Sequence, residues 1–172
     1  MKKQITIMLL LLALLFASQA MTEKTKMNYT GKVSWEEIYL PPSDDGEVLF
    51  LTEWRCYLLI SRSDGEAWEL EIPSGEEVKN LSFDESNFEE TDDGFLLHFN
   101  WGGGRYFWSE TFFFKESDGE PCLYKIESRL TEYTLNKKTG DFDDETDTKV
   151  RMIAPLIKLS DFNEKLPKLL GQ

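Results

Sequence analysis

The chain has few of the residues from which catalytic and metal sites are usually built. Its 172 residues include a single histidine, His98, and two cysteines, Cys56 and Cys122. A structural zinc site needs four ligands at recognised spacings, and a histidine-based triad needs a nucleophile and an acid beside the imidazole. The sequence shows neither pattern. It therefore predicts no metal ion, no cofactor and no catalytic residue, and it places His98 on an ordinary strand.

Basic residues are also scarce, with 19 Lys and Arg against 32 Asp and Glu and a formal charge of −13. Such a charge opposes binding to nucleic acid phosphates and to anionic lipid surfaces. It favours a basic protein as the partner, because long-range attraction speeds the encounter of opposite charges. A surface that is acidic only for solubility explains the same composition, so both interpretations stay open.

One long apolar run, residues 5–17, lies near the start of the chain. It follows Lys2 and Lys3 and precedes Ser18-Gln19-Ala20, which is the form of a secretory signal peptide cleaved before Met21. The run is shorter than the about 20 residues that span a bilayer, and no cysteine lies near the cleavage site. We expect a chain exported to the periplasm or the medium, without a stable membrane anchor. Removal of the two lysines would change its formal charge from −13 to −15.

The remaining residues divide into a polar N-terminal segment, 21–31, and a single β-rich domain, 32–172, of a size suited to one core. Both cysteines lie in this domain. In an oxidising compartment an even pair most simply forms a disulfide, so we predict a bond between Cys56 and Cys122. Two separate buried thiols are the alternative.

Apolar and aromatic runs separated by turn residues predict a chain of strands. Residues 68–72 alternate apolar side chains with glutamates, which is the period of a half-buried strand. Residues 106–114 carry aromatic side chains on both faces, as in a central strand. Strands are predicted at 33–40 (a strand or a short helix), 48–51, 54–60, 68–72, 95–101, 106–114, 123–135 and 149–157.

Turn and cap signals complete the fold prediction. Asp-Gly pairs at 45–46, 64–65, 93–94 and 118–119, and Thr-Gly at 139–140, predict hairpins between the strands. Near the C-terminus, Asp161 as a cap, Glu164 in the first turn and Pro167 as a limit predict one short helix. The predicted class is mainly β: an antiparallel sheet arranged as a sandwich, a barrel or a twisted meander, with a short C-terminal helix.

The stretch Trp101-Gly-Gly-Gly-Arg105-Tyr-Phe-Trp108 is the candidate ligand site. Three glycines let a ligand approach the backbone closely, and their N–H groups could form an anion nest. Arg105 would bind a carboxylate, while Trp101 and Trp108 offer faces for stacking. The spacing matches neither a P-loop nor a dinucleotide motif, so a plain hairpin loop between core strands is the alternative.

The many carboxylates do not single out a catalytic pair. The acidic run from Asp141 to Asp147 resembles an EF-hand loop at its start, but Thr146 stands where that loop needs glycine and Met152 where it needs glutamate. Glycoside hydrolysis requires two carboxylates about 5–9 Å apart across a cleft, which a sequence cannot place.

These observations favour an exported binding protein that engages a basic protein, as inhibitors of lytic enzymes and immunity proteins do. An envelope glycan hydrolase using carboxylate catalysis is a first alternative, with weaker support because no residues can be named for it. A structural subunit of an envelope assembly, recognisable by an exposed aromatic patch, is a second.

Overall fold

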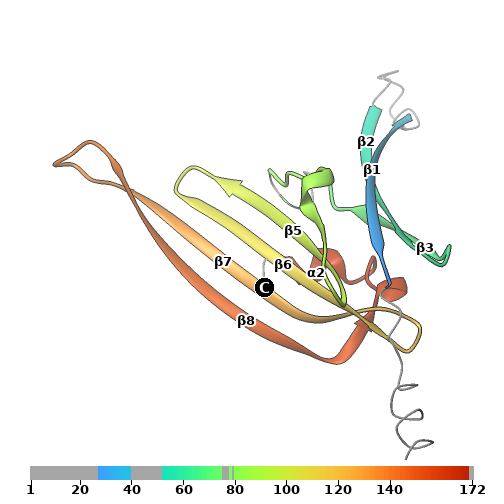
Figure 1. Ribbon diagram of the computed structural model, residues 1–172. Helices are drawn as coiled ribbons and strands as arrows, with labels where there is room; N and C mark the ends of the chain where they lie inside the picture. Colours follow the sequence, from blue (N-terminus) through green and yellow to red (C-terminus); the bar gives the residue numbers. More distant parts are fainter. Residues whose placement is uncertain (1–26, 40–51, 75–77, 79, 171–172) are drawn as a thin grey trace, which may run out of the picture.

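The computed structural model describes residues 27–39, 52–74, 78 and 80–170, and within them the chain forms two antiparallel sheets (Figure 1). We call the first sheet A, with strand order β1-β2-β3, and the second sheet B, with order β4-β5-β6-β7-β8. The predicted mainly β class is confirmed, and no barrel is closed. The strands are β1 (Tyr29–Tyr39), β2 (Thr52–Arg62), β3 (Ala67–Ile72), β4 (Phe88–Glu90), β5 (Gly94–Gly103), β6 (Tyr106–Ser117), β7 (Glu120–Leu135) and β8 (Phe142–Lys158).

The core lies between the inner faces of the two sheets. Alternation along β2 directs Leu58 and Ile60 inward, and alternation along β6 does the same for Phe112 and Phe114. The rings of Phe95 and Phe114 stack with their centroids 4.7 Å apart. Buried apolar area of this extent is the main driving force for folding.

The C-terminal segment fills the core from the side. A 3-10 turn, η2 (Leu159–Asp161), precedes the short helix α2 (Leu166–Leu169). Phe162 packs edge-on against Phe112 and Phe114, with centroids 5.5 and 5.1 Å away. A short C-terminal helix is thus present, but it starts later than predicted, and Pro167 lies in its first turn instead of ending it. Among the described residues, no helix has both the length and the apolar character needed to cross a membrane.

The strands predicted within the described residues are present, most of them with longer bounds; residues 33–39 form a strand and not a helix, and β4 was not predicted. β1 begins at Tyr29, a buried core residue inside the segment 21–31 that the sequence marks as polar. The predicted strand at 48–51, the turn at 45–46 and the signal peptide at 1–20 lie outside the described residues. The turn at 118–119 joins β6 to β7, and positive φ angles of 54° at Asp118 and 86° at Gly119 fit a two-residue hairpin loop.

The predicted disulfide is wrong, because both thiols are free and buried. Cys56 lies in β2 of sheet A, and burial raises the pKa of its thiol to about 11. Cys122 lies in β7 of sheet B, where its Sγ is 3.7 Å from the carbonyl oxygens of Ser117 and Glu120. The thiol of Cys122 therefore packs against the β6–β7 turn of its own sheet.

A buried polar network joins the two sheets at the end opposite the β7–β8 loop. Arg62 of β2, only 8% exposed, binds Asp64 at 2.8 Å, Glu116 of β6 at 3.0 Å and the carbonyl oxygen of Gly119 at 2.9 Å. The hydroxyl of Tyr29 donates to the second oxygen of Glu116. Burial, together with this hydrogen bond, raises the pKa of Tyr29. Sheet A is thus tied to sheet B by charge as well as by packing.

Strands β7 and β8 continue past the end of β6 as a two-stranded arm (Figure 1). The last pair between β6 and β7 is Tyr106 with Glu132, whereas β7 and β8 stay paired as far as Leu135 with Phe142. The acidic run at 141–147 therefore starts on this arm and continues beside the part of β7 that β6 also pairs, with its side chains exposed.

Candidate functional site

Two of the three predicted ligand-binding residues come together. Trp101 of β5 and Trp108 of β6 are direct partners in the register of sheet B. With Gly102–Gly104 and Asn80 they line an open hollow of about 420 Å³. Trp101 is only 9% exposed and belongs to the core, so Trp108 offers most of the indole surface.

The glycines of this hairpin serve the packing of Trp108. At Gly102, where φ is +109°, an added Cβ would lie 2.7 Å from the Trp108 ring and 2.7 Å from the carbonyl oxygen of Tyr106. Asn80 donates its amide to the carbonyl oxygen of Gly102 at 3.0 Å. The backbone at Gly102 is therefore held in place by the indole ring of Trp108 and by the hydrogen bond from the Asn80 amide to its carbonyl oxygen.

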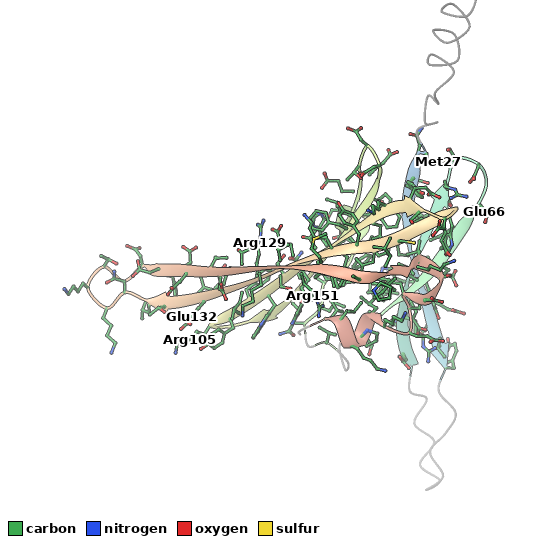
Figure 2. The ribbon with its side chains drawn as sticks, turned by 90° about the horizontal axis from the view of Figure 1, so that it is seen from below. Met27, Glu66, Arg105, Arg129, Glu132 and Arg151 are labelled. Carbon is green, nitrogen blue, oxygen red and sulfur yellow. The ribbon has the colours of Figure 1, made fainter. Side chains whose placement is uncertain are left out.

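Arg105 does not line the hollow. Its Nε donates to Glu132 Oε1 at 2.7 Å, and this hydrogen bond raises the pKa of the guanidinium group. Figure 2 shows Arg105 beside Glu132, at the base of the β7–β8 arm. The carboxylate that Arg105 was predicted to bind is thus supplied by the chain itself.

His98 has the neighbours of a triad without a substrate pocket. Its Nδ1 lies 3.1 Å from the hydroxyl of Thr111, and its Nε2 lies 3.4 Å from a carboxylate oxygen of Glu89. The Glu89 side chain is well exposed, and the three residues line none of the hollows described in this section. A triad also needs a substrate site with an oxyanion hole beside the nucleophile, so these contacts alone do not assign catalysis. No three His, Cys, Asp or Glu side chains of the described residues converge as metal ligands.

Asp64, Asp84 and Glu120 are poor general acids. Hydrogen bonds from Arg62, Ser86 and Lys158 lower the pKa of Asp64, Asp84 and Glu120, respectively. A glycosidase acid needs the opposite shift.

One buried carboxylate, Glu110, escaped the sequence analysis. It accepts a hydrogen bond from Ser128 Oγ at 3.0 Å and lines a small hollow of about 170 Å³ with Trp108 and Asp147. Its position two residues before Phe112 marks it as inward-facing, a signal that strand alternation could have supplied.

Three aromatic side chains stand exposed on one face of sheet A. They are Trp35 at 58%, Tyr39 at 69% and Trp54 at 57% exposure, and we call them the aromatic end. In register, Trp35 pairs with Cys56, Glu37 with Trp54 and Tyr39 with Thr52, so these positions share the inner face. The same face is buried from Cys56 and Ile72 onward. The aromatic end is therefore the part of the inner face that extends beyond the core.

Carboxylates surround the aromatic end. Glu37 is directly opposite Trp54, and Asp84 and Glu85 share a shallow hollow of about 360 Å³ with Trp35. A second hollow of about 360 Å³ beside Trp54 is lined by Glu53, Glu71 and Arg55, among others.

The guanidinium group near this surface, that of Arg55, is already paired with carboxylates. Arg55 lies 3.6 Å from Glu53 and 3.4 Å from Glu71. Asp84 is fixed as the N-cap of η1 (Glu85–Asn87), where it accepts from the Ser86 backbone at 2.8 Å. Three carboxylates, those of Glu37, Asp84 and Glu85, thus lie on the face of the aromatic end, and those of Glu53 and Glu71 lie with Arg55 on the opposite face of sheet A.

Comparison of the chain with models of known protein families, with curated proteins and with solved structures gave no match. The function must therefore be argued from the surface itself.

Proposed function

We propose that this chain is an exported binding protein that engages a basic protein through the aromatic end of sheet A. The observation that carries the proposal is the group of Trp35, Tyr39 and Trp54, each more than half exposed, beside the carboxylates of Glu37, Asp84 and Glu85. Large aromatic side chains gathered on a surface mark an interaction site, because leaving them in water forgoes their burial energy.

The chemistry of this surface suits arginine and lysine. A guanidinium or ammonium group is attracted to an indole face and pairs with carboxylates, and Trp and Tyr often dominate binding energy. The chain makes such contacts internally, since Arg62 lies 5.3 Å from the centroid of the Trp68 ring. The overall charge of −13 adds long-range attraction for the same partner.

Affinity capture from envelope extract and culture fluid tests this proposal. The baits are the wild-type protein, the double variant Trp35→Ala/Trp54→Ala, and the control Phe142→Ala. Phe142 is 69% exposed and lies at the tip of the β7–β8 arm, so the control removes an aromatic side chain of similar exposure elsewhere. Circular dichroism and thermal melting would establish that all three fold.

We expect one stoichiometric basic protein on the wild type and on the Phe142 variant, and none on the double variant. It should be released between about 0.05 and 0.5 M salt, because screening weakens attraction between exposed charges. Retention of that protein by the double variant would contradict the proposal. Capture of several proteins as a salt-resistant assembly would favour the second candidate function, that of a structural subunit, which an exposed aromatic patch also supports.

A further inference from the structure

Strand β2 is longer than its neighbour β3 at the aromatic end. The last pair between them is Cys56 with Ile72, and Pro73 follows. Within the described ranges, no strand lies beside residues 52–55 on this side of β2. The space is the hollow that Glu53, Trp54 and Arg55 line together with Leu81 and Phe83.

The backbone of Trp54 is directed into this space. The N–H of Arg62 donates to Glu66 on the β3 side at 2.8 Å, and the N–H of Ser63 donates to Asn28 on the β1 side at 2.9 Å. Alternate residues of an antiparallel strand direct both N–H and C=O to the same neighbour. The β2–β3 register runs unbroken from Ser61 to Cys56, and the β1–β2 register continues to Thr52. Every second residue of β2 from Arg62 to Trp54 therefore directs its N–H and C=O to the β3 side. At Trp54 these groups point to the place where β3 has already ended.

We infer that an extended segment of the basic partner adds to sheet A at this edge and pairs with the backbone of Trp54. The inference rests on the proposed function and specifies how the partner binds. Strand addition suits an edge that ends beside a hollow, because main-chain hydrogen bonds supply affinity and side-chain pockets supply specificity. Residues 52–55 offer about 13 Å of edge, enough for about four residues of the partner.

The two faces of sheet A at this edge determine which side chains the partner segment can carry. A residue opposite Trp54 places its side chain on the Trp54 face, toward Leu81 and Phe83, and an apolar side chain fits there. Its neighbours along the segment fall on the other face, beside Glu53 and Glu71, where lysine or arginine fits. The segment should therefore alternate basic and apolar residues. Further cations of the partner would lie over Trp35 and Tyr39.

Amide exchange of the isotope-labelled protein, followed by NMR, tests this inference. The probe is a peptide of about five residues that alternates lysine and valine, and the control peptide is the same with N-methylated valines, which cannot donate hydrogen bonds. The Trp54 amide should exchange rapidly in the free protein and at least tenfold more slowly with the probe, but not with the control. The amide of Ile60, which lies inside sheet A, should be protected throughout.

Three results would overturn the inference. If the Trp54 amide is already protected without peptide, the edge is occupied. A second copy occupies it if the protection depends on protein concentration, and the chain itself occupies it if the protection does not. If the probe shifts the Trp35 and Trp54 indole signals without slowing the Trp54 amide, the surface binds cations but not as a strand. If no signal of the aromatic end moves, the proposed function fails and strand pairing fails with it.

Discussion

Replacement of Arg62 by methionine should destabilise the protein strongly, because it removes the centre of the network between the sheets. The guanidinium group is buried and pairs with Asp64, with Glu116 and with the carbonyl oxygen of Gly119. Methionine keeps most of the apolar length of the side chain, so the loss comes mainly from charge and hydrogen bonds. The carboxylate of Glu116, whose side chain is 20% exposed, would remain without its cation.

Removing one partner of a buried ion pair costs about 3–5 kcal/mol. The partners of Arg62 are not fully buried, so we expect the lower end of this range, about 3 kcal/mol. For a chain of this size that loss lowers Tm by about 6–12 °C. Addition of Glu116→Gln should restore about 1 kcal/mol, because it removes the charge left behind, and the two effects are coupled.

Urea denaturation followed by tryptophan fluorescence measures these free energies of unfolding. The control is Lys149→Met, since Lys149 pairs with Asp147 at 3.4 Å and both side chains are exposed, at 80% and 65%. An exposed pair contributes less than about 1 kcal/mol, so this variant should remain close to wild type. A loss below about 1 kcal/mol for Arg62→Met, or no recovery with Glu116→Gln, would refute the argument that this network joins the sheets.

Gly102→Ala should lower the free energy of unfolding by about 2 kcal/mol, because the added Cβ would lie 2.7 Å from an indole ring. Gly104→Ala should lower it by about 1 kcal/mol, because its added Cβ meets nothing within 4 Å. Equal shifts in Tm would contradict this assignment. The hydrogen bond from Lys158 lowers the pKa of Glu120 in the folded protein below its ordinary 4.5. This interaction therefore stabilises the folded protein fully above the unfolded pKa of Glu120, and the stabilisation is lost as pH falls through the folded pKa. The urea midpoints of wild type and Glu120→Gln should differ at pH 7 and converge as the pH falls below the folded pKa of Glu120, and a constant difference would contradict the shift. Cys56 and Cys122 should both react with a thiol reagent in denaturant without reductant, and fewer than two thiols would contradict the free state.

Local patterns predicted the strands because they reflect the side chains each strand must bury. The alternation of Trp68, Leu70 and Ile72 with glutamates indicated β3, and the Asp118-Gly119 pair indicated the β6–β7 hairpin. The C-terminal helix was less well predicted. The capping signal at Asp161 is local, whereas Phe162 and Leu166 occupy positions that the core between the sheets requires. Tertiary packing decided where the helix forms.

The proposed binding surface could not be predicted because exposure depends on what lies opposite a strand. Trp54 and Trp101 both lie in strands rich in apolar residues, yet Trp54 is 57% and Trp101 9% exposed. The pairing of Arg105 with Glu132 is equally invisible, since these residues meet only through the register of β6 and β7. Alternation could have placed Glu110 on an inward face, but neither Glu110 nor Arg62 was predicted, and their partners come from other strands.

The dissociation constant of the purified captured protein, measured with Trp54→Ala and with Phe142→Ala, tests the central claim most directly. Loss of a central aromatic side chain from a binding surface costs about 2 kcal/mol or more, which weakens binding about 30-fold. We expect at least that weakening for Trp54→Ala, with Phe142→Ala within about twofold of wild type. Equal affinities of the two variants would contradict the assignment of the aromatic end of sheet A as the binding surface.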